Sequence, residues 1–184
     1  VESVSGDRYD DYIRKRVLGP LEPHDMFVCE YPPPQRASER IRRSDEGVQP
    51  VPYIDMSAWA GQGSINSSVI DLLRWSSALN HGRIVTEDSL SLLRSPSIVR
   101  GTHATAEIPY GMAQRLGSID GYHKVGHTGT FDGGSAALAF YPRAALEIAV
   151  VSNTYGNGTP HAHTIETAIA KLILGVTDPD VASQ

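Results

Sequence analysis

The stretch Val125-Gly126-His127-Thr128-Gly129-Thr130-Phe131-Asp132-Gly133-Gly134 carries most of the information about this chain. It begins with a strand pattern and passes into small residues, where one histidine stands beside two hydroxyl side chains. The flanking glycines would let another backbone approach closely. A strand edge of this kind can offer N–H and C=O groups to an extended substrate. Taken alone, the same residues also fit a strand that ends in a glycine-rich turn.

The neighbouring segments predict a sheet around this stretch. Strand patterns separated by turn residues occupy 108–116, 121–129, 135–142 and 146–152. Their short connections make consecutive strands antiparallel neighbours. The last two are continuously apolar in their middles, which is typical of strands covered on both faces.

A helix that begins at Thr159-Pro160 and is capped by Gly175 should follow the sheet. Its predicted apolar face comprises Ala162, Ile165, Ala168, Ile169, Leu172 and Ile173.

The first half of the chain reads as helices and one long irregular segment. An apolar stripe predicts a helix over 6–18 that ends at Gly19-Pro20. No period holds from Leu21 to about Ala60, and a segment of that kind usually covers a functional site or is mobile. Ser68 with Asp71 resembles a capping box that opens a helix, and Thr86 opens another. The predicted fold class is therefore α+β, an antiparallel sheet with helices on both faces.

Composition excludes several classes of function. The 184 residues are 40% hydrophobic and 20% charged, with a net charge of −5, which disfavours nucleic acid as a partner. No apolar run approaches the ~20 residues of a membrane span. We expect the basic cluster Arg36, Arg40, Arg42 and Arg43 to be a solvated loop.

Metal binding and cysteine chemistry are also disfavoured by the sequence. His161 and His163 would diverge by about 200° on a helix, and no acidic residue or cysteine stands at ligand spacing, so no metal and no cofactor are expected. Cys29 is the single cysteine, so the chain can form no internal disulfide.

Four segments, taken in order, resemble one protein superfamily. They are Gly6 to Leu21, Ala60 to Ser67 with Asp71-Leu72 and Trp75, Tyr110-Gly111, and Gly126-His127-Thr128-Gly129. They are similar to segments of serine β-lactamases and penicillin-binding proteins, particularly the class-C-like esterases and D-amino-acid peptidases. The resemblance implies a β-lactamase/transpeptidase-like fold and acyl transfer through a serine.

Two motifs that the resemblance requires are missing. That family's nucleophile is the serine of Ser-x-x-Lys, but the residues three before Lys15, Lys124 and Lys171 are not serine. The family's third motif is Lys-Thr-Gly or its His-Thr-Gly variant, which Gly126-His127-Thr128-Gly129 matches. Tyr155-Gly156-Asn157 spells the family's Tyr-x-Asn motif but follows this third motif instead of preceding it, so we interpret it as a loop tip. The expectation is a C-terminal portion of a hydrolase, inactive by itself, whose nucleophile lies on a missing N-terminal segment.

The resemblance also assigns roles to residues of the opening stretch. His127 takes the cation position of the third motif, and Thr128 and Gly129 would contact the substrate. Thr130 would supply one backbone N–H of the oxyanion hole. A neutral imidazole, the form of about three-quarters of histidines at pH 7, favours an ester or amide substrate over a penicillin.

The sequence leaves alternatives open. We divide 1–184 into a helical and loop region 1–100, a sheet with its C-terminal helix 101–175, and a tail 176–184. Expected partners are a small-molecule or peptide substrate and the missing N-terminal segment. A non-catalytic domain that binds peptide or cell-wall material, or a truncated product without a role of its own, would fit the same residues, and the compartment can be cytoplasmic or exported.

Overall fold

The structure is a computed structural model that describes residues 1–28, 33–35, 37–56, 59–96, 98–101 and 107–176. Cys29, Arg36 and all of the expected tail except Val176 lie outside these residues. Within the described ranges, no helix is both long enough and apolar enough to cross a membrane.

The main sheet, as far as the chain is described, has six strands in the order β10-β9-β8-β7-β6-β5, and every neighbouring pair is antiparallel. These strands are β5 (Ile98–Gly101), β6 (Glu107–Tyr110), β7 (Arg115–Ile119), β8 (Tyr122–Phe131), β9 (Gly134–Tyr141) and β10 (Leu146–Ser152), and a short helical turn, η4 (Pro142–Ala144), joins β9 to β10.

The prediction of one strand over 108–116 is wrong, because β6 and β7 are separate strands joined by a turn. Gly111 N–H donates to the Gln114 carbonyl across that turn at 2.8 Å. The turn lies against the end of a helix, where a Cβ on Gly111 would come within 2.2 Å of the Leu93 carbonyl oxygen. This close approach requires glycine.

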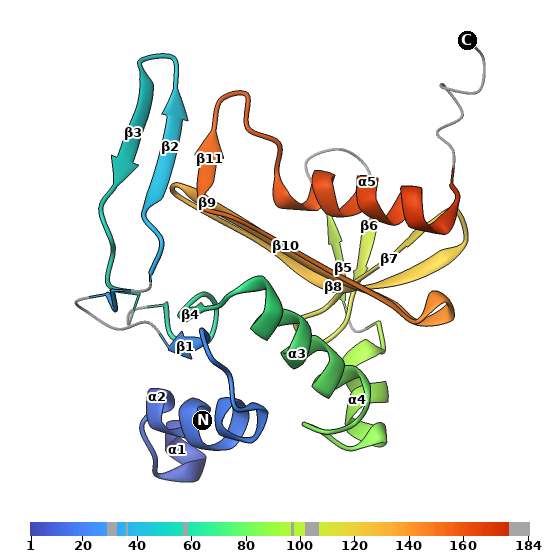
Figure 1. The fold of residues 1–184 in the computed structure, drawn as a ribbon. Coiled ribbons are helices and arrows are strands. Elements are labelled where there is room, and N and C mark those ends of the chain that lie inside the picture. The colour runs from blue at the N-terminus through green and yellow to red at the C-terminus, as the bar shows by residue number, and fades with distance from the viewer. Residues whose placement is uncertain (29–32, 36, 57–58, 97, 102–106, 177–184) are drawn as a thin grey trace.

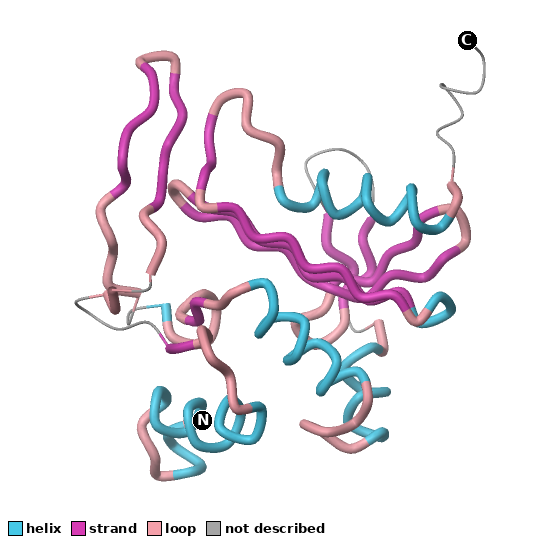
Figure 2. The backbone as a smooth tube through the Cα atoms, in the orientation of Figure 1, coloured by secondary structure: helices cyan, strands magenta, loops and turns pink. Residues whose placement is uncertain are grey.

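Helices cover both faces of the sheet, which confirms the predicted α+β class (Figures 1 and 2). α5 (Ala162–Leu174) lies on one face, and α3 (Val69–Asn80) lies on the other with α4 (Glu87–Arg94) beyond it. A core cluster of Ala139, Tyr141, Ile148 and Ala170 joins β9, β10 and α5.

Both predicted helix starts in the first half are confirmed, but the capping box at Ser68 is only half formed, because the Ser68 N–H donates to the Asp25 carbonyl and not to Asp71. Ser68 Oγ accepts the backbone N–H of Asp71 at 3.2 Å, and Thr86 Oγ1 accepts that of Ser89 at 3.3 Å. Each cap satisfies an N–H group that the first turn of a helix leaves without a partner.

Helix α5 differs from its prediction in start and in orientation. It begins at Ala162 with His161 as N-cap, although Gly175 caps its end with a φ of 69° as predicted. The buried face of the helix is Ala162, Glu166 and Ala170, so the predicted apolar face is right for Ala162 and wrong for its C-terminal part, where Leu172 is 83% exposed. Small alanines allow close approach to the sheet, and the buried Glu166 has partners there that sequence patterning cannot show.

The N-terminal residues are helical, but not as one helix. Gly6, with a φ of 75°, separates α1 (Glu2–Ser5) from a helical run made of α2 (Tyr9–Tyr12), η1 (Ile13–Leu18) and η2 (Gly19–Leu21). Leu18 is buried there with Met26 and Val28, so this run is packed against the small sheet of β1 (Phe27–Val28) and β4 (Ile65–Asn66).

The irregular segment predicted from Leu21 to Ala60 contains a β-hairpin. β2 (Arg40–Ser44) and β3 (Gly47–Val51) pair antiparallel, and β11 (Thr154–Gly156) adds to β2 in parallel. The solvated-loop prediction is therefore wrong for Arg40, Arg42 and Arg43, which lie in β2. The loop-tip interpretation of Tyr155-Gly156-Asn157 is also wrong, because its first two residues lie in β11. A Cβ on Gly156 would lie 1.9 Å from the Arg43 carbonyl oxygen, so this pairing requires glycine.

Candidate active site

Strand β8 carries the stretch on which the sequence analysis centred, and it has one open edge. Pairing with β9 continues to Phe131 opposite Gly134, whereas pairing with β7 stops at Gly126 opposite Arg115. Among the strands that the structure describes, none pairs with the other edge of 127–131. The predicted substrate residues therefore lie where the sheet leaves backbone groups accessible.

The register decides which peptide groups face that open edge. Asp132 and Gly133 form a two-residue turn, whose flanking pair, Phe131 and Gly134, is hydrogen-bonded. Because pairs alternate, Gly129 and His127 also direct their N–H and C=O groups to β9. The Leu138 carbonyl points to β8, as this register requires, because its oxygen lies 2.0 Å from the position that a Cβ on Gly126 would take. The peptide groups of Thr128 and Thr130 therefore point to the open edge.

His127 is exposed and uses both ring nitrogens. Nδ1 lies 2.7 Å from the Thr128 carbonyl oxygen, and Nε2 lies 2.8 Å from the hydroxyl of Tyr110. The Tyr110 and His127 rings meet edge to face with centroids 5.8 Å apart. The sequence singled out Tyr110 as part of the resemblance but gave it no role.

On the α5 side of β8, the side chains of Lys124, Thr128 and Thr130 share one face because strand side chains alternate. A hollow of about 380 Å³ lies there, bordered also by Arg115, His163 and Glu166. Gly117 stands opposite Lys124 on β7, and a Cβ on it would meet nothing within 4 Å. Because Gly117 has no side chain, it leaves open the polar space that the two threonines border.

A buried carboxylate joins this face of β8 to α5. Glu166 is fully buried, accepts the Tyr141 hydroxyl at 2.7 Å, and forms an ion pair with Lys124. Burial, followed by the hydrogen bond to Glu166, raises the pKa of Tyr141 well above its ordinary value. Tyr141 therefore remains a hydrogen-bond donor, and Glu166 has a partner on each oxygen.

The two histidines at the start of α5 border the same hollow. Burial and then the neighbouring His161, Lys124 and Arg115 hold the pKa of His163 below its ordinary value. The rings of His161 and His163 lie 5.2 Å apart, because His161 is the extended N-cap and does not belong to the helix, so the predicted divergence is wrong. In the described part of the chain, no three residues of the metal-ligating types cluster closely enough to hold an ion.

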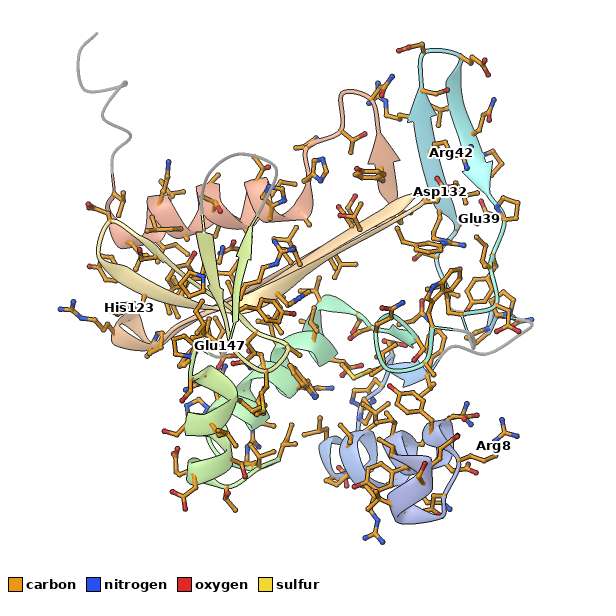
Figure 3. All side chains as sticks on the ribbon, turned by 180° about the vertical axis from the view of Figure 1, so that it is seen from behind. Arg8, Glu39, Arg42, His123, Asp132 and Glu147 are labelled. Carbon is orange, nitrogen blue, oxygen red and sulfur yellow. The ribbon has the colours of Figure 1, made fainter. Side chains whose placement is uncertain are left out.

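The β2–β3 hairpin packs against the turn at the end of β8. Arg42 binds both carboxylate oxygens of Asp132, with Nε 2.8 Å from Oδ1, and the two side chains point toward one another in Figure 3. This contact holds the pKa of Asp132 below its ordinary value. Arg40 lies over the Phe131 ring at 5.2 Å. Arg40 and Arg42, which the sequence analysis placed in a loop, thus hold the end of β8 in place.

Of the predicted site residues, His127, Thr128, Gly129 and Thr130 all lie along the open part of β8. Sequence reasoning missed Tyr110 as the partner of His127 and the arginines that bind Asp132. Only the tertiary pairing of distant strands brings these groups together.

Comparisons with known proteins give one family. A family model described as Beta-lactamase matches residues 1–171. No curated protein has a sequence that matches this chain significantly.

Solved structures share the fold at low sequence identity. The octameric penicillin-binding protein homologue from Pyrococcus abyssi has a TM-score of 0.82 at 23% identity, over 95% of this chain and 39% of its own. D-amino acid amidase from Ochrobactrum anthropi SV3 has a TM-score of 0.80 at 17% identity, over 95% of this chain and 53% of its own. D-stereospecific amidohydrolase from Streptomyces sp. has a TM-score of 0.76 at 20% identity, over 91% of this chain and 49% of its own. This chain thus spans 39–53% of the length of these proteins.

Proposed function

Because this chain belongs to the beta-lactamase family, whose members and structural neighbours are hydrolases, we propose that it is the C-terminal portion of a serine hydrolase. The reaction is acyl transfer to a serine on a preceding segment of a longer protein. The absence of Ser-x-x-Lys from the 184 residues supports this division. The chain contributes the substrate-binding strand of the site.

The observation that carries the proposal is the open edge of β8 at Thr128 and Thr130. In acyl transfer a negative charge develops on the carbonyl oxygen, and N–H donors aimed at that oxygen stabilise it. The N–H of Thr130 points away from β9, so it is available for this role. The nucleophile's own N–H supplies the second donor.

The substrate is an ester, an amide or a β-lactam-like compound. Two structural neighbours are a D-amino acid amidase and a D-stereospecific amidohydrolase by name, which favours amides. His127 adds no permanent charge at the third-motif position, so recognition of a substrate carboxylate is weaker than a lysine there would give.

The test compares the 184-residue chain with the same chain joined to the sequence encoded directly before it in its gene. Both are treated with a serine-directed covalent probe and with an activated ester. We expect labelling and turnover with the longer protein and neither with the short chain, because removing the nucleophile forfeits most of the catalysis. Stoichiometric labelling of a serine within the 184 residues would contradict the proposed division.

The open edge favours one other function, a non-catalytic domain that binds an extended peptide or cell-wall fragment by adding it to β8. The longer protein decides between the two. A preceding segment without Ser-x-x-Lys and Tyr-x-Asn, together with peptide binding and no turnover, would favour the binding domain.

A further inference from the structure

Tyr110 contacts the candidate site from another strand. It ends β6, where Tyr110 pairs with Arg115 at the start of β7, and Arg115 pairs with Gly126 of β8. Two strand pairings therefore place the Tyr110 hydroxyl within 2.8 Å of His127 Nε2. The edge-to-face ring contact holds the two side chains in this relation.

The contact of His127 with a backbone carbonyl determines where its ring proton lies. A carbonyl oxygen only accepts, so the contact of Nδ1 with the Thr128 carbonyl requires a proton on Nδ1. In the neutral ring, Nε2 then carries no proton and accepts a hydrogen bond from the Tyr110 hydroxyl. The opposite tautomer would lose the bond to the carbonyl, because its Nδ1 could not donate, and its Nε2–H would donate to the Tyr110 oxygen instead.

This tautomer changes what β8 offers at its open edge. The Thr128 carbonyl points to that edge, but it already accepts the His127 Nδ1–H, so it has less accepting capacity left for a substrate than the Thr130 carbonyl has. The N–H and C=O groups of Thr130, one pleat further along, are the next pair that faces the same edge. An extended substrate would therefore pair at Thr130.

We propose that Tyr110 is a positioning residue that sets the register of the substrate on β8. Its hydroxyl and its ring hold the His127 imidazole in the orientation in which Nδ1–H donates to the Thr128 carbonyl, which leaves Thr130 as the residue whose N–H and C=O groups are both available to the reacting acyl group. This proposal rests on the proposed function, because it concerns the same edge and the same substrate.

The matched pair of variants is Tyr110→Phe and Tyr155→Phe. Tyr110→Phe keeps the aromatic contact and removes the hydroxyl that binds His127. Tyr155→Phe removes a hydroxyl from another tyrosine that meets a histidine edge to face, His161 at 5.1 Å, far along the chain from the motif. The pair separates loss of the Nε2 bond from the general effect of removing a tyrosine hydroxyl.

The first measurement reads the tautomer directly in the 184-residue chain. Imidazole nitrogens of the ¹⁵N-labelled chain are recorded by long-range ¹H–¹⁵N NMR at about pH 8, above the ordinary histidine pKa. We expect a protonated Nδ1 and a bare Nε2 for His127 in the parent and in Tyr155→Phe. Tyr110→Phe frees the ring at Nε2, so the ring can turn away from the Thr128 carbonyl, and a substantial fraction of His127 should convert to the Nε2–H tautomer.

Two results of this measurement would overturn the proposal: an Nε2–H tautomer of His127 in the parent chain, or an unchanged His127 spectrum in Tyr110→Phe. If Tyr110→Phe fails to fold, as judged from its amide spectrum, the parent spectrum still decides the tautomer. A change of the same size in Tyr155→Phe would also count against a specific role for Tyr110.

The second measurement uses the longer, active protein. Tyr110→Phe should lower kcat/KM for an amide by about five- to tenfold, the effect of losing one hydrogen bond, with most of the change in kcat because misregistered substrate still binds. A normal kcat in a variant whose tautomer has changed would refute the link to register. A longer protein without any turnover would instead refute the proposed function and leave the NMR result standing.

Discussion

Replacing Glu166 tests whether its buried ion pair with Lys124 holds α5 to β8. In Glu166→Gln, one side-chain oxygen can still accept the Tyr141 hydroxyl, but Lys124 loses its charge partner. Removing one member of a fully buried pair typically costs about 3–5 kcal/mol. Lys124 is 22% exposed at the edge of the hollow and can recover some hydration, so we expect a loss of about 2–3 kcal/mol.

The matched control is Asp132→Asn, which breaks the Arg42 ion pair. Those two side chains are 48% and 36% exposed, and exposed ion pairs contribute little to stability, so the control should be nearly neutral. Tyr141→Phe should cost about 1.5–3 kcal/mol, because its hydroxyl donates to a charged acceptor.

Urea unfolding of the 184-residue chain, followed by circular dichroism, gives the free energy of unfolding of each variant. The slope m should remain that of the parent, since the buried area is unchanged. A Glu166→Gln variant within about 0.5 kcal/mol of the parent would refute the reasoning, because surface substitutions already vary by that much. So would a Glu166→Gln cost no greater than that of Asp132→Asn.

Three further predictions concern the site and its support. In the longer protein, Thr130→Ala keeps the backbone N–H and should change kcat little, whereas Thr130→Pro removes it and should lower kcat on the order of a hundredfold to a thousandfold. Thermal melting must show that the proline variant is folded. Equal impairment of the two variants would contradict the oxyanion-hole assignment of Thr130. His127→Lys should raise the acylation rate for a β-lactam relative to that for a neutral ester, because an ammonium group adds a permanent charge that an imidazole does not carry. An unchanged ratio of the two rates would place His127 away from the substrate carboxylate. Burial tends to raise the pKa of Asp71, but N–H groups of Asp25 and His24 and the guanidinium of Arg74 outweigh it, so the pKa is below its ordinary value. Its ionised form therefore stabilises the fold above about pH 4 and loses this effect as the pH falls through the folded-state pKa; acid unfolding of Asp71→Asn should show a shallower pH dependence than that of the parent.

Local chemistry was sufficient for the elements whose signals lie within a few residues. Ser68 and Thr86 open α3 and α4 because a short hydroxyl side chain caps the helix that follows it. Gly175 ends α5 because it adopts a left-handed conformation that side chains disfavour. The order of the strands and the Gly126-His127-Thr128-Gly129 motif likewise identified the α+β class and the family.

Long-range contacts decided what local patterns could not. Arg40 to Ser44 carry no strand signal, yet they form β2 because β3, β11 and the turn at Asp132 each bind them from elsewhere in the chain. Helix α5 turns Glu166 inward because Lys124 and Tyr141, both remote in sequence, supply its partners.

The candidate site divides in the same way. The sequence by itself determined its residue types, His127 to Thr130, because strand, glycine and hydroxyl chemistry are local. The tertiary structure decided that this strand keeps one open edge, which peptide groups face it, and that Tyr110 binds His127. Those features depend on where β7 stops pairing and on the register of β8 with β9, and register is a relation between segments that no single segment encodes.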